Sequence, residues 1–162
     1  MTLAVTQYGW LLFLHVTSAG LFFAGAVVAG VAQIAALQRN RPSEIATLLR
    51  VARRGVVLVG VGSLGALAFG LWLAGYVQGY GFGDTWIAAS IGLWVVSQAL
   101  GGAGGRSARR ARERAEELAV AGDEPDAELR SLLAHRPSLL LSWASTAAVV
   151  AILVLMVWKP GA

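Results

Sequence analysis

One histidine, His15, interrupts the long apolar stretch WLLFLHVTSAGLFFAG at residues 10–25. Imidazole titrates near neutral pH and is a common metal ligand. Its charged form is expensive in hydrocarbon, so we expect a neutral ring with one nitrogen free to accept a hydrogen bond or to bind a metal. On a helix the near neighbours of this ring are Leu11, Ser18, Ala19 and Phe22. Such a surround suits a flat porphyrin, and it suits a hydrogen bond to a serine of another helix equally well.

Few other side chains are available to complete a site with His15. The chain has no cysteine, which excludes disulfides, thiolate metal sites and thiol catalysis. Ordinary metal sites need three or more ligands, and no cluster is spaced for one, so neither a metal site nor a catalytic residue is predicted. If the cofactor is haem b, the thioether of Met156 is a weak candidate for a second axial ligand. His15 of a second copy, in a symmetric dimer, is the alternative.

The elements that carry these residues are predicted to be membrane helices. Of the 162 residues 57% are hydrophobic and 14% are charged, against about a quarter charged in a soluble domain. About 20 apolar residues in a helix cross a bilayer, and only an internally hydrogen-bonded backbone is tolerated there. The sequence therefore predicts an all-α, multi-pass protein of the cell membrane, a four-helix bundle forming one membrane domain over residues 1–162. The expected spans are approximately 8–37, 56–76, 86–105 and 138–158.

Two arginine-rich connectors, residues 38–55 and 106–137, set the predicted orientation. They hold all twelve arginines, whereas residues 78–85 have no basic residue and only Lys159 follows the last span. Basic loops stay in the cytoplasm, so both termini are expected outside. The second connector is expected to be a solvated helical hairpin that continues the third span and breaks at GDEPD. Ser43 is the expected N-cap of the helix that leads into the second span.

The surplus positive charge belongs to the first connector. Its five arginines and one glutamate give +4, whereas seven arginines and seven acidic residues cancel in the second connector. We therefore expect Arg50, Arg53 and Arg54 to face the lipid headgroups of the inner leaflet. The bilayer is thus the predicted partner of these arginines, and no nucleic acid is expected.

Small residues are expected to hold the helices together, because lipid tails are as apolar as leucine and close approach supplies the attraction. Small residues at helical spacing carry this packing prediction. They are Gly62, Ala66, Gly70 and Ala74 in the second span, and Ala26 and Gly30 in the first, with Gly25 and Ala29 beside them. Serines repeat along one face of the third span and one face of the fourth. They are expected to bond mainly to their own backbones.

The segment LHVTSAGLFFAG and the terminal LMVWKPGA resemble the predicted integral membrane family named domain of unknown function 2269. Members of that family open with a Leu-His, small-residue, glycine pattern and close on Met-x-x-Lys-Pro. The similarity covers the four-helix layout end to end. The first span is also similar, more loosely, to the HemJ-type protoporphyrinogen oxidases and the copper-resistance D membrane proteins. HemJ-type proteins bind haem b through a first-helix histidine, which implies His15 as an axial ligand here.

Three functions fit these features. The first is a non-catalytic membrane subunit or binding protein that packs against a second copy or another membrane subunit through its small-residue faces. The alternative is a haem b-binding membrane redox protein with His15 as axial ligand. A small transporter ranks last, because ion-coupled transport usually leaves carboxylates or paired charges inside the membrane. The apolar runs contain neither.

Overall fold

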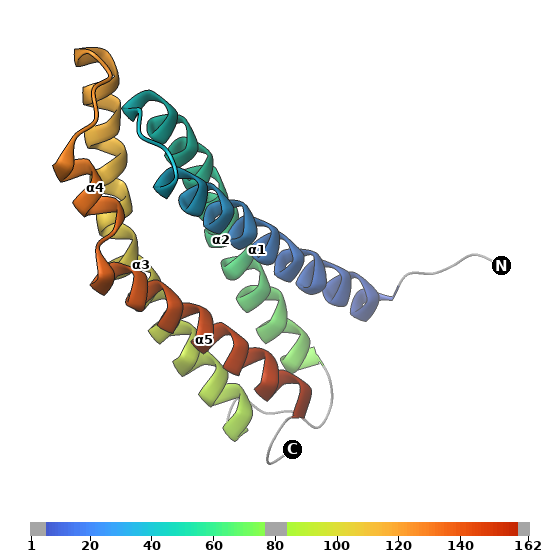
Figure 1. The fold of residues 1–162 in the computed structure, drawn as a ribbon. Coiled ribbons are helices and arrows are strands. Elements are labelled where there is room, and N and C mark those ends of the chain that lie inside the picture. The colour runs from blue at the N-terminus through green and yellow to red at the C-terminus, as the bar shows by residue number, and fades with distance from the viewer. Residues whose placement is uncertain (1–5, 77–83, 159–162) are drawn as a thin grey trace. The chain divides into compact units, whose positions relative to one another are not determined.

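The structure, a computed structural model, describes residues 6–76 and 84–158. These residues contain five helices (Figure 1). Their bounds are α1 Gln7–Leu37, α2 Pro42–Tyr76, α3 Thr85–Ala121, α4 Ala127–Leu133 and α5 Arg136–Trp158. Within these ranges, four helical segments are long and apolar enough to cross a membrane, the last of them through α5. The all-α membrane fold is therefore confirmed. Part of the connection at 78–85, together with Lys159, lies outside the described residues.

Both arginine-rich connectors are largely helical. α2 has 35 residues and α3 has 37, well beyond the length of about 20 that a bilayer requires. The extra turns are the polar residues before the second apolar span and after the third. α3 ends where Gly122 adopts a φ of 133° and Asp123 a φ of 58°. Glycine favours such a left-handed helix end, since it has no Cβ to clash with the backbone.

The predicted N-cap of the helix that leads into the second span is wrong. α2 begins at Pro42, whose missing N–H is no loss in a first turn. Ser43 therefore lies inside the helix and is not its N-cap. α4 begins at Ala127, and the carboxylate of Asp126 caps it by accepting the N–H of Leu129 at 2.7 Å.

The chain divides into two compact units. The described residues of the first unit are 6–33 and 50–76, in which α1 and α2 lie side by side and antiparallel (Figure 1). The second unit contains residues 34–49, where α1 turns into α2, together with residues 84–158. The expectation of one domain over residues 1–162 stays a prediction.

The second unit has a hydrophobic core that joins both connectors. Its eight buried residues are Ala36, Ile45, Ala46, Leu49, Ala111, Ala115, Leu129 and Leu133. Ile45 and Leu129 are each only 1% exposed. The expected solvated hairpin is thus packed along one side, because α3 and α4 bury their apolar faces against the turn between α1 and α2.

The α3–α5 pair of the second unit packs through small residues and serines. Ser145 donates its hydroxyl to the backbone carbonyl of Ser97 at 2.9 Å, which links the two helices. A Cβ on Gly104 would lie 2.7 Å from Ser142 Oγ and 2.9 Å from Ser138 O. The hydroxyl of Ser142 instead bonds within α5, where it donates to Ser138 O at 3.0 Å.

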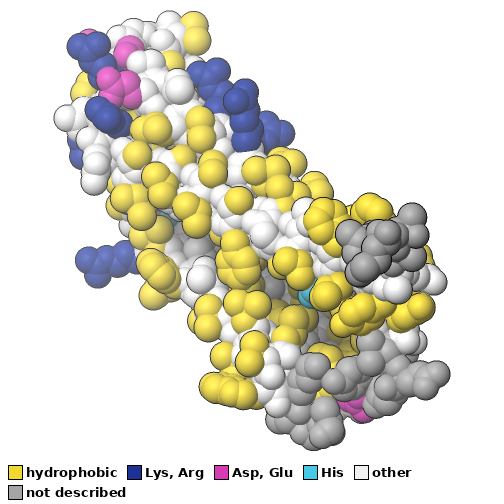
Figure 2. Space-filling view, turned by 90° about the vertical axis from the view of Figure 1, so that its right-hand side faces the viewer, with side chains coloured by type: hydrophobic (Ala, Val, Ile, Leu, Met, Phe, Trp, Pro, Cys, Tyr) yellow, Lys and Arg dark blue, Asp and Glu magenta, His cyan; other side chains and the backbone are white. Residues whose placement is uncertain are grey.

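Large apolar side chains remain exposed along the spanning helices. Figure 2 shows hydrophobic side chains spread along the displayed face. Phe13 is 58% exposed, Val27 63% and Trp143 72%. In water such a surface would be a liability, but in a bilayer these side chains contact lipid.

Candidate functional site

His15 lies half-buried on α1 and contacts α2. Its Nδ1 is 2.9 Å from the backbone carbonyl oxygen of Ala66. A carbonyl oxygen can only accept, so Nδ1 must carry the hydrogen and donate it. In the neutral ring Nε2 then keeps its lone pair. The partner is a backbone carbonyl, not the serine hydroxyl that the sequence left open, and this bond fixes which ring nitrogen is available to a ligand.

Gly70 provides the space in which the imidazole of His15 lies. A Cβ at Gly70 would be 2.9 Å from His15 Cε1 and 3.0 Å from Nδ1, but 4.0 Å from Nε2. Any larger residue would push the ring off α2 and stretch its hydrogen bond. Gly70 and Ala66 were predicted as packing residues; the structure also makes them the support of the histidine. Their spacing of four hinted at one shared face, but nothing in the sequence paired that face with His15.

The α1–α2 contact is a close approach of backbones. A Cβ on Gly62 would meet the backbone N of Phe22 and would lie 2.7 Å from Ser18 O. Gly25 and Gly55 oppose each other in the same way, since a Cβ on Gly25 would lie 2.6 Å from Gly55 O. Gly25, Gly55 and Gly62 therefore lie where α1 and α2 approach closely.

The predicted stripe on α1 is displaced by one residue. Ala26 and Gly30 are exposed, and a Cβ on Gly30 would meet no heavy atom within 4 Å. Gly25 is buried and Ala29 is half-buried, and these two residues contact α2 instead. Neighbouring residues of a helix lie 100° apart, so a stripe shifted by one residue faces a different direction.

The other predicted site residues of the first unit lie toward the two ends of α2. Ala74 is half-buried near the end of α2, whereas Arg50, Arg53 and Arg54 are exposed near its start. Met156 is half-buried near the end of α5, in the second unit. Its role as a haem ligand stays a prediction. In residues 6–76 and 84–158 no group of three His, Cys, Asp or Glu is placed to hold a metal ion.

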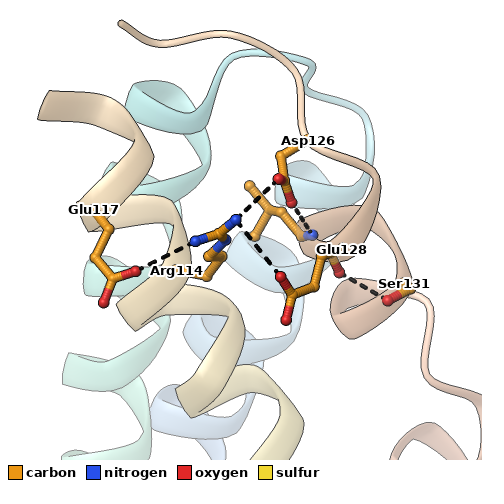
Figure 3. Close-up of polar contacts among 6 residues, drawn as sticks. Arg114, Glu117, Asp126, Glu128 and Ser131 are labelled. Carbon is orange, nitrogen blue, oxygen red and sulfur yellow. Dashed lines mark hydrogen bonds and ion pairs between the residues drawn. The ribbon is translucent and has the colours of Figure 1, made fainter. Parts of the chain in front are cut away.

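Arg114, on α3, has three carboxylate partners in the second unit (Figure 3). Its guanidinium lies 3.2 Å from a carboxylate oxygen of Asp126, and 3.6 Å from oxygens of Glu117 and Glu128. The hydrogen bond and charge of Asp126 raise the pKa of Arg114. The pKa of Asp126 is lowered, chiefly because the N–H of Leu129 donates to its carboxylate. This network ties α3 to the start of α4.

Asp123 joins the two connectors across 80 residues of sequence. Its carboxylate accepts the backbone N–H of Ser43 at 2.7 Å and the Ser43 hydroxyl at 2.7 Å. It thus satisfies an N–H of the first turn of α2 that lacks an intrahelical acceptor. These two bonds, from the N–H first, lower the pKa of Asp123, and the charge of Arg41 adds to the effect. Arg130 also donates to Asn40, a second link between the connectors.

The Asp123 bonds should make the connectors sensitive to acid. A carboxylate whose pKa is lowered on folding stabilises the fold above its unfolded pKa, about 4, and the contribution is lost as pH falls through the folded value. We expect the hydrogen-exchange protection factor of the Ser43 amide to fall below about pH 4. In Asp123→Ala protection should already be low at neutral pH, whereas Glu116→Ala, which removes an exposed carboxylate from the same connector, should behave like the wild type. A protection factor of the Ser43 amide that does not change with pH in the wild type would contradict this prediction.

Residues 10–160 match the family described as predicted integral membrane protein (DUF2269). No curated protein and no solved structure matches the chain.

Proposed function

The chain belongs to the predicted integral membrane protein family DUF2269, and on that premise we propose that it is a non-catalytic membrane subunit or binding protein whose binding group is His15. The hydrogen bond from His15 Nδ1 to the Ala66 carbonyl carries this proposal. It orients the ring and leaves one lone pair, on Nε2, for a ligand. Gly70 leaves room for the ring, since a Cβ there would lie 2.9 Å from Cε1 and 3.0 Å from Nδ1 but 4.0 Å from Nε2.

The residue types around His15 favour binding over acid–base catalysis. From Trp10 to Leu37 and from Gly55 to Gly75 the sequence contains no Asp, Glu, Lys, Arg or Tyr. Side chains of these types are among those that usually share proton transfer in a catalytic site. The proton on Nδ1 is already committed to a backbone carbonyl, so Nε2 is the nitrogen left for a ligand.

Haem b is the second candidate, because the same hydrogen bond suits an axial ligand. A metal-binding histidine almost always donates its other N–H to a carbonyl or carboxylate, which fixes the tautomer and raises the basicity of the binding nitrogen. His15 has this arrangement with Ala66. When bound, haem would supply redox chemistry. His15 would hold the iron through Nε2, and Met156 or His15 of a second copy stays the prediction for a second ligand.

The absorption spectrum of protein purified from haem-supplied cells tests the haem proposal. A Soret band should be present in the wild type and lost in His15→Ala. His135→Ala is the matched control, because the exposed His135 ring instead caps the start of α5 by accepting the N–H of Ser138 at 3.3 Å. A colourless wild type would remove haem and leave the broader binding proposal open to the next experiment.

Crosslinking tests the subunit proposal. Reagents that react with the connector at residues 106–137 should capture a second copy or another membrane subunit, and the product should be identified by mass spectrometry. Recovery of the monomer alone, at membrane concentrations, would count against a subunit role.

The proposed orientation places both arginine-rich connectors in the cytoplasm and both termini outside. The charge asymmetry of the loops supports it. Single cysteines placed within residues 106–136 should resist a membrane-impermeant thiol reagent in intact cells and react after permeabilisation. Labelling of these cysteines in intact cells would show that the orientation is the reverse of the proposed one.

A further inference from the structure

One stripe of α2 begins with arginines and continues with exposed apolar residues. The stripe has spacings of four and three residues in turn, which place its members along one side of a helix. Its members are Arg50, Arg54, Val57, Val61 and Leu64. Arg53 lies beside them, four residues before Val57. Val57 and Val61 are each 57% exposed and Leu64 is 60% exposed. The stripe therefore runs without interruption from cationic to apolar.

The packing of α1 on α2 keeps this stripe outward. The other side of the helix carries the buried Leu49 and Ala52. One turn on, a Cβ at Gly55 would lie 2.7 Å from the backbone N of Ala29, so α2 has no freedom to rotate at this level. Arg53 and Arg54 precede Gly55 by two residues and one residue, and both are exposed where Gly55 is buried.

The first connector offers little negative charge to balance Arg53 and Arg54. Glu44 is the only acidic residue in the sequence of the first connector. Its Oε2 lies 3.8 Å from Nε of Arg39. In the part of the chain that the structure describes, neither Arg53 nor Arg54 pairs with a carboxylate. The second connector differs, since its Arg114 is paired three times.

We propose that Arg50, Arg53 and Arg54 bind the phosphate of an anionic phospholipid whose acyl chain lies along Val57, Val61 and Leu64. Guanidinium groups bind phosphate oxygens in a two-pronged geometry that ammonium groups cannot reproduce. The order of the stripe, phosphate-binding and then apolar, matches the order of a lipid molecule. An acidic protein segment would match the arginines but would leave the apolar half uncovered. This site goes beyond the proposed function and does not involve His15.

A lipid titration of the full chain in neutral detergent tests the proposal. Phosphatidylglycerol should raise the melting temperature more than phosphatidylcholine with the same acyl chains. Glycerol phosphate, which has the headgroup charge without the chains, should have no effect at the same concentration. This comparison needs no variant. Equal shifts with both lipids would overturn the proposal, and an equal shift with glycerol phosphate would replace the lipid by a free phosphate ligand and overturn it too.

Variants then locate the site. The triple change Arg50→Gln, Arg53→Gln and Arg54→Gln should weaken phosphatidylglycerol binding at least about tenfold, since each arginine near an anionic surface contributes roughly a factor of five. The matched control removes the same charge from three exposed arginines of the second connector: Arg106→Gln, Arg110→Gln and Arg136→Gln. The control should bind nearly as the wild type does. An equal loss in both triple variants would show general charge attraction and overturn the site.

If the first variant fails to fold, a variant with lysine at the three arginine positions, which keeps the charge, should still bind more weakly than the wild type. Wild-type affinity in this lysine variant would overturn the two-pronged contact.

Discussion

Gly62→Ala should lower the free energy of unfolding of the α1–α2 pair by about 2–3 kcal/mol, the usual cost of overpacking a close contact. The new methyl would meet the backbone N of Phe22 and lie 2.7 Å from Ser18 O. Backbone atoms cannot swing aside as a flexible side chain can, so the two helices must separate. Titration with a denaturing detergent in mixed micelles, followed by circular dichroism, measures the loss.

Gly60→Ala is the matched control for this change. It lies on the same helix, two residues away, and a Cβ there would meet no heavy atom within 4 Å. Alanine is favoured over glycine in a helix by roughly 0.5–1 kcal/mol, so this variant should unfold like the wild type or slightly later. If both variants behaved alike, the close approach of α1 and α2 at Gly62 would be wrong.

Ile45→Ala and Leu129→Ala should each destabilise the second unit by about 2–5 kcal/mol, as large-to-small changes in a tight core do. Each residue is 1% exposed, and the two come from the two different connectors. Loss of either contact frees the connector at residues 106–137. Because this connector is rich in arginine, trypsin should cleave it much faster in the variants, in membranes as well as in detergent.

Val120→Ala is the control for the core variants. Val120 lies near the end of α3 and is 91% exposed, so its loss should change stability by no more than about 0.5 kcal/mol. Cleavage as slow in Ile45→Ala as in Val120→Ala would mean that the connectors do not share a core.

Two residues show why the functional site could be predicted only in part. His15 stands out in the sequence because a titratable ring is rare in an apolar run. Its partner, the carbonyl of Ala66, has no side-chain signal, since every residue carries the same carbonyl. Likewise, the carboxylate of Asp123 and the hydroxyl of Ser43 can be read from the sequence. That they bond to each other depends on how the two connectors pack.

The sequence alone determined the membrane helices and the helical connectors. Charge-free runs of sufficient length must be helices in lipid, whatever they pack against, and strong helix formers carry α3 on to Ala121. Only the tertiary structure decided which side of each helix meets another. Gly25 and Ala29, not Ala26 and Gly30, face α2. Hydropathy cannot distinguish adjacent stripes of small residues, because lipid is as apolar as a neighbouring helix and the choice depends on backbone fit.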